Sequence, residues 1–125
     1  MINKQHRFHG YGSLNYVYRH GKTVRGPMSA LKFIANDRRD TYRLAVVVSK
    51  KVSKSAVVRN RIRRRLYEVF RLCEHEINQP YDIVMTIFSE DVATVPSAEL
   101  NNIVAVQLKQ AGIIPGRRGT NELSS

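Results

Sequence analysis

The chain has 125 residues, 42% of them hydrophobic, and carries 21 Lys and Arg against 10 Asp and Glu, a formal net charge of +11. This length suits one compact domain, and the charge favours a polyanionic partner, either nucleic acid or an anionic membrane surface. There is no apolar run of about 18 residues and no signal-peptide pattern, so we expect a soluble, cytoplasmic protein without a membrane span. The single Cys73 leaves no disulfide partner, and the four His are too scattered for a zinc-finger type of metal site.

The N-terminal part predicts a flexible arm followed by a short helix. Residues 1–12 are polar and basic, and we expect them to form the arm. Ser13 is a plausible N-cap and Gly21 a plausible C-terminal stop, which predicts a helix from Leu14 to His20. Helical spacing places three side chains on one face: Leu14, Val17 and Tyr18.

Strand-like patterns follow. Thr23 to Arg25 predicts an edge strand, and Ser29 to Ala35 alternates between two sets of side chains. Tyr42 to Ser49 is rich in β-branched residues, and the segment 36–40 between them is polar. We therefore predict that these two longer strands form an antiparallel hairpin.

The most basic part of the chain is residues 50–71, which hold nine Lys or Arg against one acid, Glu68. A helix is predicted to begin near Ser55 or Ala56 and to run to between Glu74 and Ile77. Its core-facing stripe at helical spacing is Val58, Ile62, Leu66, Val69, Phe70 and Cys73. Cations cover the rest of the helix surface.

The C-terminal part predicts one more strand and one more helix. Tyr81 to Phe88 is an apolar run typical of a buried strand, and Ala98 to about Ala111 is an amphipathic helix that Gly112 ends. Residues 113–125 are expected to be a disordered tail with little to pack. The sequence thus predicts one α+β domain over residues 1–112, with a single small mixed sheet of about four strands and three helices in the order α-β-β-β-α-β-α.

The basic segment has an ordinary interpretation, because most charge runs form a solvated face. Pairs that Glu68 forms on the helix surface contribute only about 0.3–0.5 kcal/mol, so they do not neutralise nine cations. Arg outnumbers Lys by 14 to 7, and the planar guanidinium suits phosphate and base contacts. We favour a nucleic acid as partner. For Asn60, between Arg59 and Arg61, an RNA contact and simple assistance to the helix start are equally good explanations.

The run SKKVSKSAVVRNRIRRRLYEVFR, residues 49–71, resembles the signature of the bacterial ribonuclease P protein subunit. LNYVYRHG from Leu14 resembles the first helix of that family, and YDIVMTIF from Tyr81 resembles its fourth strand. The resemblance covers roughly residues 5–112. It implies a subunit whose partners are a catalytic RNA and precursor tRNA, in an endonuclease that removes the 5′ leader. It also implies that the RNA carries catalysis and holds most of the Mg²⁺, and that the protein alone is inactive.

The resemblance implies two RNA-contacting surfaces and neither a catalytic nor a metal-binding residue in the chain. The residues expected to meet the catalytic RNA are Lys50, Lys51, Lys54, Arg59, Asn60, Arg61, Arg63, Arg64 and Arg65. A cleft between the first helix and the sheet is expected to hold the leader, lined by Leu14, Tyr18, Phe33, Val46 and Val48. An equally good interpretation of Phe33, Val46 and Val48 is that they are core residues.

The sequence departs from the family pattern in three places. Leu14 replaces a Phe, and Ser53 replaces a Gly in the spacer, which leaves the conformation of the 50–54 loop open. Phe88 and Ser89 stand where relatives often carry a basic residue, so no leader contact is carried over there.

Two other functions fit the charge. A ribosomal or general RNA-binding protein would bind RNA without preferring a precursor over mature tRNA, and a self-sufficient nuclease would cleave without an RNA subunit. A membrane-surface role is weaker, because the apolar stripe of the basic helix is needed for the core.

Overall fold

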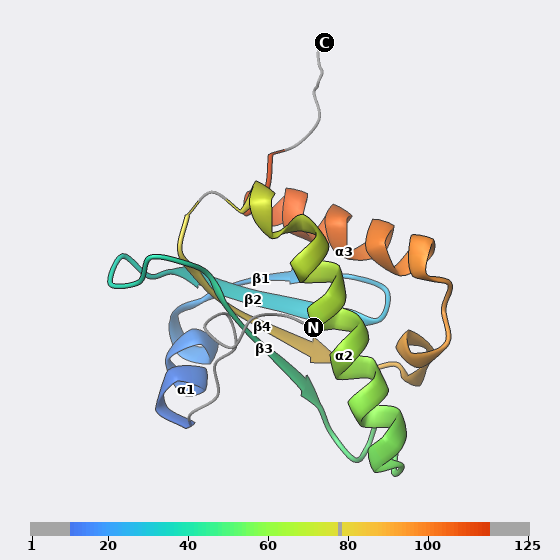
Figure 1. Ribbon diagram of the computed structural model, residues 1–125. Helices are drawn as coiled ribbons and strands as arrows, with labels where there is room; N and C mark the ends of the chain where they lie inside the picture. Colours follow the sequence, from blue (N-terminus) through green and yellow to red (C-terminus); the bar gives the residue numbers. More distant parts are fainter. Residues whose placement is uncertain (1–10, 78, 116–125) are drawn as a thin grey trace.

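Three helices pack on a four-stranded mixed sheet in the computed structural model, which describes residues 11–77 and 79–115 (Figure 1). The elements are α1 (Tyr11–His20), β1 (Lys22–Arg25), β2 (Ser29–Ala35), β3 (Arg43–Val48), α2 (Ala56–Cys73), β4 (Tyr81–Ile87) and α3 (Ser97–Ala111), with short 3-10 turns η2 (Glu74–Glu76) and η3 (Glu90–Ala93). This order confirms the predicted one. The predicted arm lies outside the described residues up to position 10, as does the predicted tail from position 116.

The strand order in the sheet is β1-β2-β4-β3, so the predicted hairpin of β2 with β3 is wrong. β2 pairs antiparallel with β4, and β3 pairs parallel with β4 on the other side. β4 is buried along most of its length, which favours a central place. The 36–40 segment crosses the start of β4, where the amide of Asn36 donates to the carbonyl of Pro80 at 2.8 Å.

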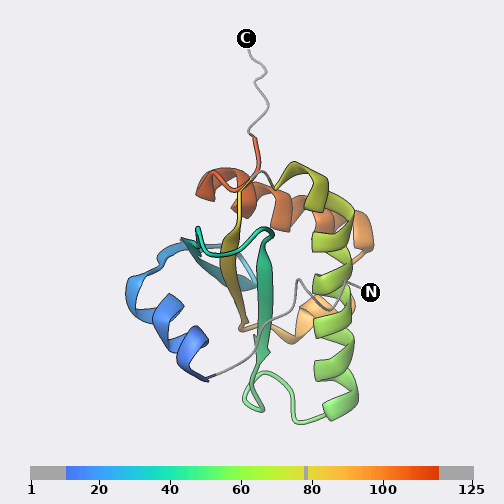
Figure 2. The same cartoon turned by 60° about the vertical axis from the view of Figure 1, so that its left-hand side comes forward.

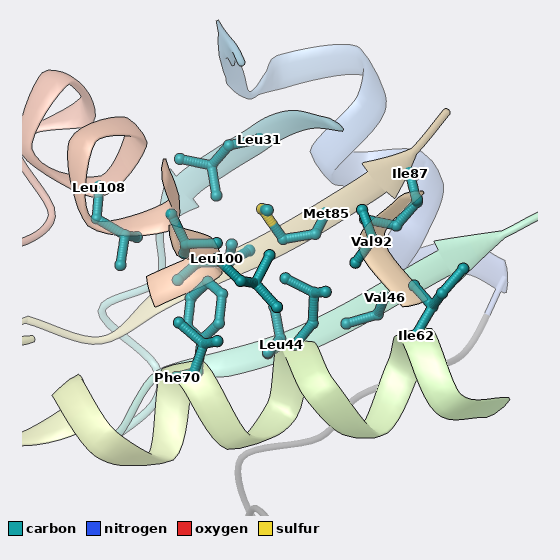
Figure 3. Packing of buried hydrophobic residues seen from close by; sticks show 14 of the residues in the cluster. Leu31, Leu44, Val46, Ile62, Phe70, Met85, Ile87, Val92, Leu100 and Leu108 are labelled. Atoms are coloured by element: carbon teal, nitrogen blue, oxygen red, sulfur yellow. The ribbon is translucent and has the colours of Figure 1, made fainter. Parts of the chain in front are cut away.

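The main core lies between one face of the sheet and the helices α2 and α3 (Figure 3). α2 contributes Ile62, Leu66, Val69 and Phe70, as its periodicity predicts. From the sheet and α3 come buried side chains of alternate strand positions and of one helix face: Leu31, Phe33, Leu44, Val46, Val48, Ile83, Met85, Ile87, Leu100, Val104 and Leu108. The basic helix is therefore anchored by its apolar stripe.

The opposite face of the sheet carries α1 (Figure 2). Val17 is fully buried there against Ala45 and Val84, and Leu14 packs on the same small cluster. Since neighbouring strand residues point to opposite faces, this cluster uses the positions that alternate with those of the main core.

The helix ends agree with the predicted signals, with one exception. The hydroxyl of Ser55 accepts from the amide of Val58 at 3.2 Å and caps α2. Gly112 ends α3 with a φ of 77°, a left-handed conformation that favours glycine. Gly21 follows α1 where an added Cβ would lie 2.6 Å from the carbonyl oxygen of Val17. The exception is the start of α1, which begins at Tyr11 and so places Ser13 inside the helix.

The chain continues to pack after α3. Ile113 and Ile114 are buried in the main core, 0% and 4% exposed. The predicted tail is therefore wrong at its first two positions, because the apolar pair that follows the Gly112 turn folds back onto the core.

Candidate nucleic-acid interface

Five predicted RNA-binding cations form an exposed set that we call the basic surface: Lys50, Lys51, Lys54, Arg61 and Arg64. They lie on the β3–α2 loop and on the outer side of α2, away from the sheet. Within the described part of the chain none of them makes a hydrogen bond or an ion pair. Their charges are therefore available to an external polyanion.

Arg59 and Ser53 tie the loop to the helix. Arg59 Nη1 donates to the carbonyl oxygen of Ser53 at 2.9 Å, and the Ser53 hydroxyl accepts from the amide of Ser55 at 3.2 Å. Ser53 is buried and, like the other described non-glycine residues, has a negative φ. The serine that replaces the usual glycine thus fits a loop that needs no left-handed residue there.

Asn60 and Arg63 form a pair on the exposed side of α2, where Arg63 Nη1 donates to Asn60 Oδ1 at 2.9 Å. This bond uses the carbonyl oxygen of the amide and turns its NH2 group away from Arg63. Asn60 therefore offers a donor on the same side of the helix as the basic surface.

Arg65 makes extensive contacts inside the protein. Its Nη1 donates to the carbonyl oxygen of Val92 at 2.7 Å, and its Nη2 donates to the carbonyl oxygen of Val95 and, at 3.5 Å, to the hydroxyl of Ser97. These acceptors lie in and after η3, so Arg65 fastens the β4–α3 connection to α2. Sequence spacing could not separate this arginine from its neighbours, because its acceptors are about 30 positions away.

The only acid of the basic segment pairs with Arg71 at the end of α2. Arg71 Nε donates to Glu68 Oε1 at 3.1 Å and Nη2 donates to Oε2, and this bonding lowers the pKa of Glu68 to about 2. Glu68 therefore stays ionised, paired with a cation one helical turn further along α2.

A hollow of about 490 Å³ separates α2 from α3 on the outer side. Its lining mixes Arg61 and Arg64 with the apolar Val69 and Leu100 and with polar side chains. The basic surface therefore borders a concave region of mixed polar and apolar character.

The residues predicted to line the leader cleft separate onto two faces of the sheet. Leu14 and Tyr18 lie on α1, and Tyr18 is 37% exposed. Phe33, Val46 and Val48 are buried on the other face, under α2, as Figure 3 shows for Val46. These three are core residues, so their assignment to the cleft is wrong.

The strand residues that do accompany α1 are the alternate ones, among them Lys32, Val47 and Thr86. Of these residues, Lys32 contacts α1 through its charged group. Its Nζ donates to the carbonyl oxygen of Tyr18 at 2.9 Å and lies 5.7 Å from the centroid of the Tyr18 ring. Alternation in the sequence separates Lys32 from Phe33 but does not say which set faces α1, because both sets contain apolar residues.

No group of three or more His, Cys, Asp or Glu side chains in residues 11–77 and 79–115 could hold a metal ion. In the same ranges no helix is long and apolar enough to cross a membrane.

A positively charged loop and helix, held on a small α+β domain by their apolar side, define a nucleic-acid-binding protein. The sequence pattern of the family described as Ribonuclease P matches residues 2–112. The ribonuclease P protein component of Chloroflexus aurantiacus is 38% identical over 109 residues, which cover 87% of this chain and 78% of that protein. The one from a Pseudanabaena species is 34% identical over 110 residues, 84% of this chain and 93% of that protein. The chain belongs to the ribonuclease P protein family.

Solved structures of the family share the fold. The RNase P protein of Staphylococcus aureus is 25% identical with a TM-score of 0.77, covering 87% of this chain and 97% of that chain. The one from Thermotoga maritima is also 25% identical with a TM-score of 0.74, covering 83% and 96%. Membership makes this chain an RNA-binding component of ribonuclease P in tRNA processing, with the RNA subunit as its partner.

Proposed function

We propose that this chain docks on the catalytic RNA of ribonuclease P through its basic surface and holds the 5′ leader of precursor tRNA on the sheet face beside α1. The observation that carries the proposal is the set of five cations on one side of the protein that lack partners within the described residues. The RNA subunit carries the cleavage chemistry, and the protein alone is inactive.

The basic surface acts by replacing counterions of RNA phosphates. Each phosphate contact releases bound cations, so the logarithm of the binding constant falls with the logarithm of salt by about 0.7–0.9 per contact. Lys50, Lys51 and Lys54 extend the charge of α2 along the preceding loop. Such a strip of charge reduces the repulsion between catalytic RNA and precursor, and so strengthens their association at moderate salt.

The face beside α1 acts by stacking. Tyr18 presents a partly exposed ring, and Lys32 places an ammonium group beside it. Base stacking on an aromatic ring contributes about 1–3 kcal/mol and tolerates any base sequence, which suits a leader that varies between precursors. Leu14 adds an apolar contact next to this ring. The leader site thus contains Leu14, Tyr18 and Lys32.

Magnesium is assigned to the RNA. Phosphate oxygens supply the hard ligands that Mg²⁺ prefers, and residues 11–77 and 79–115 contain no group of three or more His, Cys, Asp or Glu side chains that could hold a metal ion. The contribution of this chain is to bind and position RNA.

The test is reconstitution of a bacterial ribonuclease P RNA with and without this chain at low magnesium, followed by cleavage of a leader-bearing precursor. We expect faster cleavage with the protein and none with the protein alone. Equal cleavage with and without the protein would contradict the proposal. Cleavage by the protein alone would support a self-sufficient nuclease instead, and equal affinity for precursor and mature tRNA would support a general RNA-binding protein.

A further inference from the structure

Phe88 and Arg25 form a second exposed aromatic and cation pair. Phe88 follows the last residue of β4 and is 42% exposed. The guanidinium carbon of Arg25 lies 5.0 Å from the centroid of the Phe88 ring, within the range of a cation–π interaction. The amide of Phe88 donates to the carbonyl oxygen of Met28 at 3.0 Å, so its backbone continues the β2–β4 ladder and holds the ring in place.

This pair lies on the face of the sheet that carries α1. Arg25 is opposite Ala30 in the β1–β2 register, and Ala30 is opposite Thr86 in the β2–β4 register. Lys32 stands two positions after Ala30, and Phe88 stands two positions after Thr86. Because side chains alternate between faces, all five positions belong to one face.

The same chemistry therefore occurs twice on this face. Tyr18 has the Lys32 ammonium 5.7 Å from its ring centroid, and Phe88 has the Arg25 guanidinium at 5.0 Å. Each pair joins a flat apolar surface for a base to a positive charge for a phosphate. Proteins that bind single-stranded RNA combine these two elements repeatedly along one groove.

An acidic turn comes directly after Phe88. The hydroxyl of Ser89 accepts from the amide of Asp91 at 3.2 Å, which forms the start of η3. Glu90 and Asp91 are both exposed. Two carboxylates here repel a phosphate backbone, so a strand that passes Tyr18 and Lys32 has its last favourable contact at Phe88.

We propose that Phe88 and Arg25 form a second stacking site, which takes one unpaired base of the leader at the end of the RNA path beside α1. This inference rests on the proposed function. It assigns to Phe88 the role of a ring on which a base stacks and to Arg25 the role of a phosphate partner that also holds the ring.

The experiment uses the full chain reconstituted with a bacterial ribonuclease P RNA and a set of precursors, each with one abasic nucleotide at a different leader position. With the wild-type protein, we expect an abasic nucleotide at the position that meets Phe88 to weaken binding roughly 5- to 150-fold. In Phe88→Ala, the intact precursor is expected to bind more weakly by a similar factor, and the abasic effect at that one position disappears. Phe88→Tyr restores it, because the ring is kept.

Two controls separate the possible outcomes. Val106→Ala removes an exposed apolar side chain on α3 and is expected to leave the whole abasic profile unchanged. Arg25→Gln is expected to weaken binding of the intact precursor. The leader position at which an abasic nucleotide weakens binding is expected to stay the same, because the Phe88 ring is kept. If Phe88→Ala keeps the complete wild-type profile, the second stacking site is overturned and the proposed function stands. If the wild-type protein gives no preference for any leader over mature tRNA, the proposed leader site itself fails.

Discussion

Arg43 binds both carboxylate oxygens of Asp82, with Nε to Oδ1 and Nη2 to Oδ2 each at 2.8 Å. The two side chains are only 13% and 7% exposed, and Asn36 Nδ2 adds a third bond to Oδ2 at 2.9 Å. Arg43 starts β3 and Asp82 lies near the start of β4, so the pair joins the two parallel strands at the end where the 36–40 segment crosses between them.

Asp82→Ala is expected to lower the free energy of unfolding by about 3–5 kcal/mol, because it removes two charged hydrogen bonds from a guanidinium that is largely buried. Urea unfolding followed by circular dichroism measures the loss. Asp37→Ala is the matched control, since Asp37 is an exposed carboxylate in the same crossing segment, and a change within about 0.5 kcal/mol is expected. Equal losses for the two variants would show that the ion pair is not what stabilises this junction.

Local patterns were enough to predict the elements but not their pairing. The apolar stripe from Val58 to Cys73 repeats at helical spacing, and Ser55 caps the helix by accepting from an amide only three residues further on, so α2 could be found in the sequence. The neighbours of β4 depend on contacts between distant residues, such as Arg43 with Asp82, which no local pattern contains. The polar segment 36–40 between β2 and β3 therefore suggested a hairpin turn. In the structure this segment crosses β4, which lies between the two strands.

In the candidate site, local sequence patterns likewise could not predict what single side chains contact. Alternation separated Lys32 from Phe33, yet only packing shows that Lys32 faces α1 and Phe33 faces α2. Similarly, Arg64 and Arg65 are adjacent in a basic run, and only the carbonyl oxygens of the β4–α3 connection, which accept from Arg65, distinguish it from the exposed Arg64.

Arg65→Met is expected to lower the free energy of unfolding by about 2 kcal/mol, because the carbonyl oxygens of Val92 and Val95 lose charged hydrogen-bond donors. Arg64→Met removes the same charge from an exposed position and is expected to change stability by less than about 0.5 kcal/mol. Thermal and urea unfolding of the two variants give the comparison. If both unfold like the wild type, the contacts of Arg65 do not stabilise the protein.

Tyr18→Ala is expected to weaken binding of leader-bearing precursor by about 1–3 kcal/mol and to leave mature tRNA unaffected, because a stacking surface beside Lys32 is lost. Phe33→Leu serves as the comparison: it alters the main core on the opposite face and is expected to reduce stability while the preference for precursor remains. The affinities of the reconstituted complex for leader-bearing precursor and for mature tRNA test this prediction. A similar loss for precursor and mature tRNA in Tyr18→Ala would remove Tyr18 from the leader site.

Cys73 is expected to react slowly with alkylating agents. Burial, followed by the nearby charge of Glu76, raises the pKa of its thiol to about 11, so the reactive thiolate is scarce at neutral pH. Because this pKa lies above that of an exposed cysteine, the reaction rate in the folded protein should continue to rise well beyond pH 9. At pH 8, alkylation by iodoacetamide should be roughly 100-fold slower in the folded protein than in urea. Equal rates in the two conditions would mean that the thiol is not protected by the fold.

The salt dependence of RNA-subunit binding should distinguish the basic surface from the rest of α2. Arg64→Met removes an exposed guanidinium that makes no ion pair within the described residues, and it is expected to reduce the slope of log K against log salt by about 0.7–0.9. Arg71→Met changes the net charge by the same amount, but Arg71 is bound to Glu68 at the end of the helix and is expected to leave the slope nearly unchanged. Filter binding of the RNA subunit between 50 and 400 mM salt, a range of roughly eightfold, measures both slopes. Equal reductions would mean that net charge, and not the position of the cations on the basic surface, governs docking on the RNA.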